Sequence, residues 1–439
     1  MSVSPERRRE ILDALRRGTV PQRSLDTFAV GLEPFEGTLA EELATARTGA
    51  GVFKAVRGEY GSGKTFFSRW LQERARKEGF ATAEVQISEA ETPLHRLETV
   101  YRRLVERLAT TDTPSGALRS VVDGWFYTLE QDVLAEGLVT EAQTELLLAR
   151  TNELMEQRLA AISRTAPAFT AVLRRYRAAV AANETQLAEG LIAWLGGQPN
   201  VAAAAKREAG VKGDIDHFAA LSFLQGLLVV LRDSGYAGLL VVLDEVETLQ
   251  RVRGDVREKG LNALRQLIDE LDAGRFPGLY LVITGTPPFF DGPQGIQRLP
   301  PLAQRLHVDF RADFRFDNAR AVQIRLRGFD IEKLEAVGRR VRDIYADGSP
   351  NAERVLRLAD DAYLARLAQA VTGTLGGRVG IAPRLFLKKL VADVIDRIDQ
   401  FPDFDPKQDY SLTIADTEAT VQERAAIAGK SVDDIELPL

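Results

Sequence analysis

The sequence predicts an α/β fold, in which a parallel sheet covered by helices carries a helical insertion and a C-terminal helical lid. Three observations predict it. Short apolar runs are typical of buried strands, helical patterns separate these runs, and a glycine-rich loop follows the first of them. The chain has 439 residues, which is enough for such a core and one or two appended parts.

The composition excludes several classes of protein. The chain is 45% hydrophobic and 27% charged, as globular proteins are. It has no cysteine, which excludes disulfides, thiol catalysis and thiolate zinc sites. Its three histidines (His95, His217 and His307) are far apart, so we expect surface or packing roles for them. We find no signal peptide and no apolar run that could span a bilayer, and we expect a cytoplasmic protein without a membrane partner.

Residues 1–50 are predicted to form an N-terminal helical segment, and a P-loop core is predicted over 51–311. The first strand of this core is expected at GVFKAVR (51–57). A glycine-rich loop, a helix and a second strand at FATAEVQIS (80–88) follow it. This order of strand, loop, helix and strand is the start of a nucleotide-binding α/β fold.

The glycine-rich loop GEYGSGKT (58–65) matches the phosphate-binding pattern G-x-x-x-x-G-K-[ST]. Glycines let backbone N–H groups approach phosphate oxygens, which a Cβ would obstruct. We expect Lys64 to reach the β- and γ-phosphates and the Thr65 hydroxyl to ligate magnesium. The loop therefore predicts a P-loop NTPase that binds ATP with Mg²⁺. The predicted nucleotide-binding residues are Gly58, Glu59, Tyr60, Gly61, Ser62, Gly63, Lys64 and Thr65.

Two carboxylates end the buried strand GLLVVLDE (238–245). We expect Asp244 to hold the magnesium together with Thr65, and Glu245 to polarise the attacking water as a general base. The alternative is that both acids only solvate a strand end. A carboxylate beside Asp244 favours hydrolysis over simple nucleotide sensing.

The next strand, GLYLVITGT (278–286), is predicted to end in a polar residue of the site. In P-loop ATPases with a strand between the two nucleotide strands, the tip of that strand contacts the γ-phosphate or the water. Thr286 is our first candidate and Thr284 the second; a turn-forming threonine is the alternative. LHVDF (306–310) is predicted as the last strand.

Two arginines are candidate catalytic residues. Arg305 stands just before the predicted last strand, where oligomeric ATPases supply a cation to the γ-phosphate of a neighbouring subunit. Arg298 is the alternate. Arg384 lies in the first turn of a helix near Pro383, from which it can fold back over the phosphates. A surface role is the alternative for each. We therefore expect a homo-oligomer.

The rest of the chain is predicted to be mostly helical. A helical insertion is expected at about 110–215, between the second and third strands, and a helical lid over 312–399. The tail 400–439 is more polar, with an acidic end, and is predicted to be partly disordered.

The net charge of −6 predicts that any contact with DNA is local. Candidate basic clusters lie at Arg7–Arg9, Arg174–Arg177, Arg339–Arg342 and Lys388–Lys389. Most of them are interleaved with acids, as solvated helix faces are.

Five segments together resemble the BrxD family of bacterial BREX-associated ATP-binding proteins, over roughly residues 15–400. They are GEYGSGKT, GLLVVLDEVETL, GLYLVITGTPPFF, LPPLAQRL and TGTLGGRVGIAPRLFLKKL. That family looks like a branch of the AAA+ (ASCE) class near Orc/Cdc6 and the transposon ATPases. The resemblance implies an ATPase of phage defence that works beside other defence-system proteins on DNA. It also implies that Arg305 is a trans-acting arginine and Arg384 a sensor.

Two other functions stay open. One is a signalling or scaffold NTPase that turns over slowly and contacts only proteins. The other is an Orc/Cdc6-like or transposition-type DNA-loading ATPase, which would need a DNA-reading domain. The residues after 399 are too few for a complete winged helix.

Overall fold

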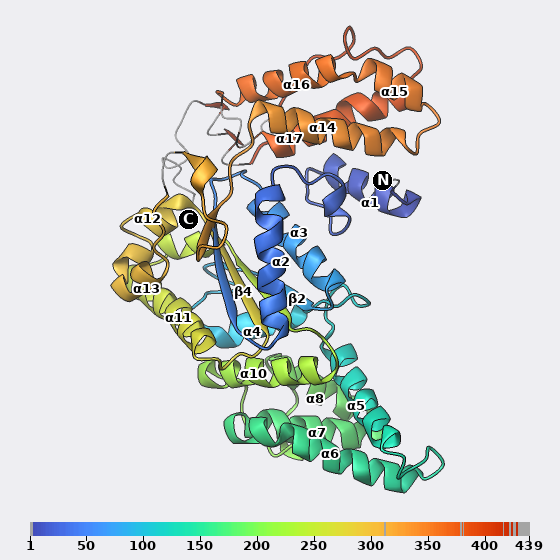
Figure 1. Ribbon diagram of the computed structural model, residues 1–439, viewed down its shortest axis with the longest axis vertical. Coiled ribbons are helices and arrows are strands. Elements are labelled where there is room, and N and C mark those ends of the chain that lie inside the picture. Colours follow the sequence, from blue (N-terminus) through green and yellow to red (C-terminus); the bar gives the residue numbers. More distant parts are fainter. Residues whose placement is uncertain are drawn as a thin grey trace.

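The computed structural model describes residues 3–310, 313–377, 380, 382–415, 417–420, 423–424 and 427–428. A sheet of five parallel strands lies at its centre, in the order β2-β3-β4-β1-β5 (Figure 1). The strands are β1 (Val52–Arg57), β2 (Ala81–Gln86), β3 (Leu239–Asp244), β4 (Leu279–Gly285) and β5 (Gln323–Arg325). The predicted α/β fold with a parallel sheet is confirmed.

Helices cover both faces of the sheet, which explains why its strands are so apolar. Every residue of β3 and β4 is buried. Alternate side chains of β3 point to opposite faces, since Leu239, Val241 and Leu243 join one apolar cluster and Leu240 and Val242 join the other. The first face packs against α4 (Leu97–Glu106), α10 (His217–Asp233) and α11 (Gly254–Asp272). The second packs against α2 (Glu33–Arg47) and α3 (Lys64–Lys77).

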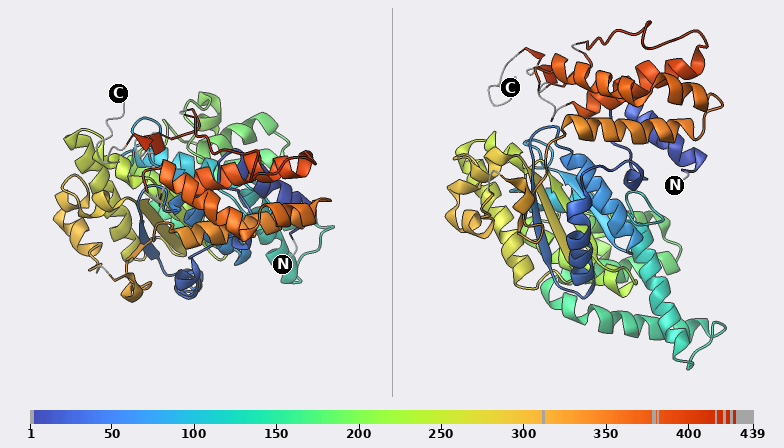
Figure 2. Two further views of the ribbon diagram at one scale, coloured as in Figure 1. Left: turned by 90° about the horizontal axis from the view of Figure 1, so that it is seen from above. Right: turned by 45° about the horizontal axis from the view of Figure 1, so that its top comes forward.

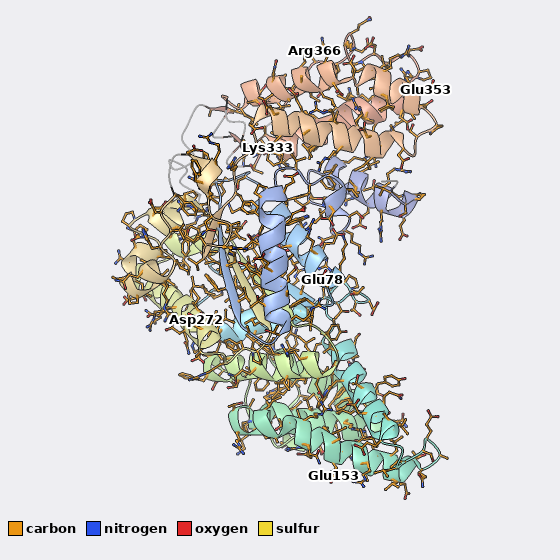
Figure 3. The ribbon with its side chains drawn as sticks, in the orientation of Figure 1. Glu78, Glu153, Asp272, Lys333, Glu353 and Arg366 are labelled. Atoms are coloured by element: carbon orange, nitrogen blue, oxygen red, sulfur yellow. The ribbon has the colours of Figure 1, made fainter. Side chains whose placement is uncertain are left out.

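A helical layer lies at one end of the molecule, between β2 and β3 in the sequence (Figure 1). Its helices are α5 (Leu118–Ala135), α6 (Thr144–Thr165), α7 (Pro167–Ala181), α8 (Thr185–Leu195) and α9 (Ala203–Glu208). Phe223 of α10 joins this layer to the core, since its ring meets those of Phe169 and Trp194 edge-on at 5.3 and 5.6 Å. Glu153, on α6, marks the far side of the layer (Figure 3).

A bundle of helices lies over the opposite end of the sheet, where the strands end (Figure 2). Its elements are α14 (Ile331–Ala346), α15 (Ala352–Leu358), α16 (Asp361–Thr374), α17 (Pro383–Lys388), a π-helical stretch (Lys389–Ile395) and α18 (Asp396–Gln400). We call it the lid.

The first helix, α1 (Pro5–Arg16), packs on the lid rather than on the sheet. Ser4 caps it by accepting a bond from the N–H of Arg7, and Pro5 occupies its first turn. Its buried side chains Ile11, Leu12 and Leu15 belong to the same apolar cluster as the lid. The Arg16 guanidinium adds two bonds to Asp396 of α18, at 2.7 and 2.8 Å.

The prediction of the last strand was wrong. Residues 306–310 are not a strand; β5 lies at Gln323–Arg325 and pairs with β1, so the sheet extends beyond residue 311. From His307 to Phe310 the side chains are partly or fully exposed, whereas Ile324 is 2% exposed in the core. This strand lacks an apolar run because Gln323 is one of its three residues, so the hydrophobic pattern did not indicate it. The amide of buried Gln323 donates to the carbonyl of Leu306.

Short elements complete the described chain. They are α12 (Pro287–Asp291), α13 (Pro300–Arg305) and 3₁₀ turns at Leu25–Thr27, Val246–Gln250, Ile296–Arg298 and Phe314–Phe316. Among the described residues, no helix has both the length and the apolar character needed to cross a membrane. The acidic end of the predicted tail, 433–439, lies outside the described residues.

Candidate active site

A cleft of about 400 Å³ opens where β1 and β3 end, between the sheet and the lid. Its floor is the glycine-rich loop, and the acids after β3 form one side. The N-terminal loops at residues 18–21 and 30–32, the lid and the C-terminal segment complete the walls. Lys333 of α14 lines it from above, where the lid meets the core (Figure 3). Carboxyl ends of parallel strands are the usual place for ligands in open α/β sheets.

The glycine-rich loop has the shape of a phosphate cradle. Gly63 has φ of +91° and precedes α3, so the N-terminal end of this helix faces the cleft. A Cβ on Gly58 would lie 2.3 Å from the Ser62 hydroxyl, so a larger residue there would force the Ser62 side chain to move. The Lys64 ammonium donates to the carbonyls of Gly58 and Glu59 at 2.8 and 3.2 Å. The buried Ser62 hydroxyl has no partner among the described residues. It is therefore available for a hydrogen bond with a ligand at this loop.

Asp244 stands at the tip of β3 and is 4% exposed. Its Oδ1 accepts bonds from the Thr284 hydroxyl and, at 3.1 Å, from the N–H of Glu245. Thr284 belongs to β4, which separates β3 from β1. The strand order therefore places an orienting hydroxyl beside the carboxylate that was predicted to hold magnesium.

Glu245 has a left-handed backbone conformation, with φ of +60°. A side chain with a Cβ pays roughly 1–2 kcal/mol for this conformation, which is typical of functional sites. The turn directs the side chain of Glu245 to the end of β2, where Gln86 donates to its Oε2 at 3.0 Å. Sequence reasoning missed Gln86, although polar residues at the tips of other strands were candidates.

Glu247 is a third carboxyl of the cleft, and it was not predicted as a site residue. It lies in the 3₁₀ turn after Glu245, is 4% exposed, and its Oε2 has no hydrogen-bond partner among the described residues. Burial raises the pKa of Glu247 to about 7, against the attraction of the Lys64 ammonium. This carboxyl therefore changes its charge near neutral pH.

We expect Glu247→Gln to remove a pH dependence of stability. The pKa of Glu247 is raised from 4.5 to about 7, so between these values the folded protein binds more protons than the unfolded chain. Its free energy of unfolding therefore falls as the pH rises through this window, by up to about 3 kcal/mol. Between pH 4.5 and 8, the melting temperature of the wild type should fall relative to that of Glu247→Gln as the pH rises. Glu353→Gln, at an exposed lid position, is the control; equal slopes for all three proteins would contradict the assignment.

The donor set of the cleft fits a magnesium ion that is held mainly by a nucleotide. Thr65 lines the cleft with Asp244, and no described group of three or more carboxylates or histidines could hold a metal by itself. Magnesium prefers oxygen ligands and is often bound by one or two protein groups together with phosphates. Thr65 and Asp244 would be the protein ligands.

The other candidate residues, at the tip of β4 and among the arginines, differ in whether they lie at the cleft. Thr286 caps α12 and does not line the cleft, whereas Thr284, the second choice, contacts Asp244. Arg305 is also outside the cleft of its own chain. Its guanidinium binds Asp269 and Asp272 of α11 at 2.8 and 2.7 Å and is 41% exposed. The alternate, Arg298, is exposed in the turn before α13.

Arg384 does line the cleft, from the first turn of α17. Its guanidinium is bonded to Glu423 of the C-terminal segment, through Nε at 3.0 Å and through Nη2. The sequence offered no signal for Glu423, because nothing in the local pattern links a glutamate of the polar tail to a helix about 40 residues earlier.

The predicted basic clusters are largely neutralised within the chain. Arg8 pairs with Asp347, Arg177 with Glu130, and Arg342 with Asp361. Arg174 and Arg175 pair with glutamates of neighbouring helices, and Lys388 and Lys389 both pair with Glu418. These clusters therefore resemble ion-paired helix faces more than a phosphate-binding stripe.

A comparison with known protein families shows which family has this sequence. The model of the family described as BREX system ATP-binding protein BrxC/D matches residues 3–414. The chain belongs to the BrxC/D family. The match includes the cleft residues from Leu15 to Leu387 but not Thr420 and Glu423, and it confirms the resemblance to BrxD-type proteins. No curated protein matches the chain as a relative.

Membership of the BrxC/D family supports ATP as the ligand of the cleft, since its members are described as ATP-binding proteins of BREX systems. The geometry agrees with this description. The phosphate cradle, the acidic strand tip and the walls from the lid meet at one cleft.

Proposed function

We propose that this BrxC/D protein hydrolyses ATP as an AAA+-type ATPase. One observation carries the proposal: Asp244 and Glu245, at the carboxyl end of β3, line the same cleft as the glycine-rich loop, and β4 separates β3 from the strand of that loop. A protein that only binds ATP needs no second carboxylate there. Glu245 is therefore assigned to the water and Asp244 to the metal.

The reaction transfers the γ-phosphoryl group of ATP to water and leaves ADP. Backbone N–H groups of the loop and Lys64 hold the phosphates, and Glu245 accepts the proton of the attacking water. Bound Mg²⁺ supplies charge neutralisation of the phosphate oxygens. Gln86 holds the Glu245 carboxylate at 3.0 Å, so Glu245 must leave this bond or share it with the water. Arg384, which belongs to the lid, is the candidate residue that would bind the γ-phosphate and so couple the nucleotide state to the position of the lid.

We also propose that the protein oligomerises and that Arg305 acts on the site of a neighbouring subunit. Arg305 lies outside its own cleft, and it is 41% exposed in its pairs with two aspartates of α11. Arg305→Ala and Lys64→Ala should each lose ATPase activity when alone. Mixed, they should recover part of it, because some interfaces then join an intact loop to an intact arginine. Mixing Lys64→Ala with Arg265→Ala, at an arginine of α11, is the control. Absence of recovery with Arg305→Ala would contradict this placement.

The biological setting follows from the family. We propose that the protein is an ATPase of a BREX anti-phage system and acts beside other defence proteins on DNA or a DNA-bound complex. The test is steady-state phosphate release by the purified protein with and without duplex DNA. We expect turnover that DNA increases. No turnover under either condition would overturn the hydrolase proposal, and turnover indifferent to DNA would overturn its action on DNA.

A second candidate is a slow-turnover switch that contacts only proteins. Two contacts favour it: Gln86 holds Glu245, and Glu423 holds Arg384, so neither side chain is free to act. The same measurement separates the candidates, because a switch would bind ATP with little release of phosphate. An Orc/Cdc6-like or transposition-type loader would instead bind DNA only in its ATP state.

A further inference from the structure

The C-terminal segment returns from the lid to the nucleotide cleft. After α18, Tyr410, Leu412 and Ile414 are partly buried against the apolar cluster of the lid. Glu418 then pairs with Lys388 and Lys389 at 3.2 and 2.8 Å. Burial would raise the pKa of Glu418, but the hydrogen bonds from Lys389, the N–H of Ala415 and Lys388 lower it to about 2. The segment is therefore fixed to the helix that carries Arg384.

The described part of this segment also contacts Arg384 directly. The Nη2 of Arg384 donates to the carbonyl of Glu418 at 2.6 Å, and Glu423 closes a two-point contact with the same guanidinium. The Glu423 side chain is only 4% exposed. The turn at Gly18 lies close to the same guanidinium, since a Cβ there would come within 3.0 Å of Arg384 Nη1. The Arg384 side chain stays 31% exposed at the cleft, and Glu423 neutralises the edge of the guanidinium that carries Nε and Nη2.

Glu423 is also held in its own position. Its Oε2 accepts from the N–H of Thr420 at 2.7 Å, and its N–H donates to the Thr420 hydroxyl at 3.2 Å. This reciprocal pair is a capping box, which accepts glutamate or glutamine equally. Glutamine at 423 therefore keeps the local fold while it removes the charge.

The charges of the cleft show what Glu423 does there. Among the described residues, four cationic side chains line it (Lys64, Arg327, Lys333 and Arg384), and so do four carboxyl groups (Asp244, Glu245, Glu247 and Glu423). When all four carboxyl groups are ionised, the formal charges of these eight groups cancel. Without it they leave an excess of one positive charge, at the arginine that faces the cleft from the lid. ATP carries more negative charge than one carboxylate, so its γ-phosphate is a competitor for the same guanidinium.

We propose that Glu423 is a positioning residue of the ATP site, which holds Arg384 in a neutralised state until the γ-phosphate displaces it. The proposal rests on the function proposed above, in which Arg384 contacts that phosphate. ATP then has to break the pair before it gains Arg384, and this lowers the apparent affinity. ADP lacks the group that competes, so the pair persists in the ADP state. Release of the C-terminal segment from Arg384 would accompany ATP binding.

The test is equilibrium binding of a non-hydrolysable ATP analogue and of ADP to the full chain, with magnesium. Glu423→Gln should tighten binding of the ATP analogue about 3- to 30-fold, as expected for removal of one charged hydrogen-bonded pair, and should change ADP binding less than about twofold. In an Arg384→Ala background, Glu423→Gln should have no effect. Because no hydrolysis is measured, an inactive enzyme would leave this result intact.

Glu418→Gln is the matched control. It removes the pairs with Lys388 and Lys389 from the same segment but keeps the Arg384–Glu423 pair. We expect its ATP affinity to stay within about twofold of wild type. The proposal is overturned if Glu423→Gln weakens ATP binding, if it tightens ADP and ATP equally, if its effect survives Arg384→Ala, or if Glu418→Gln reproduces it.

Discussion

Lys64→Ala should abolish measurable ATP binding, with a loss of affinity of at least about 100-fold. The Lys64 ammonium is buried at the centre of the loop, and its acceptors among the described residues are the carbonyls of Gly58 and Glu59. It is therefore ready to exchange those weak neutral acceptors for phosphate oxygens. A charge-assisted bond that is lost from a buried site costs about 1.5–3 kcal/mol, and two phosphates are contacted. The rise in melting temperature on addition of Mg²⁺ and ATP is the measurement, because a ligand stabilises the state that binds it.

Lys77→Ala is the matched control for this result. Lys77 lies at the other end of the same helix, where it pairs with Asp26 and Glu73 at 2.7 and 3.3 Å. Its loss removes one lysine from α3 but leaves the cleft unchanged, so the ATP-dependent rise in melting temperature should persist. A normal rise in Lys64→Ala would show that the nucleotide binds elsewhere.

Glu245→Gln should separate binding from hydrolysis. A glutamine keeps the size of the side chain and its bond to Gln86, but it cannot accept the proton of the attacking water. We expect the turnover number to fall about 10²- to 10⁴-fold, as for loss of a general base, while ATP affinity stays within about threefold of wild type. The measurements are phosphate release at saturating ATP and the ATP-dependent shift of the melting temperature.

Glu89→Gln controls for a general effect of lost negative charge, since Glu89 is exposed in the loop after β2. It should hydrolyse ATP like the wild type. Unchanged turnover in Glu245→Gln would shift the base function to another carboxyl, and Glu247 would be the next residue to replace because it is buried at the same cleft.

The parts of the fold that could be predicted are those in which the residues of a short segment alone determine its structure. Strands β3 and β4 are buried on both faces, so an unbroken apolar run identifies each of them. The loop at 58–65 is equally local, because glycine, lysine and threonine must stand at fixed intervals to surround a phosphate. The match to the BrxC/D family over residues 3–414 supports the same reading.

The rest depended on contacts that no local pattern encodes. Strand β5 is three residues long and contains a buried glutamine, whose NH₂ group donates to the carbonyl of Leu306, 17 residues earlier in the chain. The choice between Thr284 and Thr286 depended on where β4 ends, because Thr284 lies within the strand beside Asp244, whereas Thr286 lies beyond the strand at the start of α12. Glu423 meets Arg384 only because the tail folds back over the lid. The roles of Thr286 and Arg305 stay predictions.

Two connections join the core to the lid and to helix α1, which packs on the lid, and both border the cleft. Helix α1 packs on α14 and α17, yet the backbone that follows it, at residues 18–21, is a wall of the cleft. The second connection, at Leu326 to Phe329, is another wall. A body with two tethers cannot swing freely about one hinge; it can only rock about the line that joins them. That line passes beside the cleft, so a small tilt of the lid about it would change the shape of the cleft. The same tilt would move α15, at the far end of the bundle, through the longest arc.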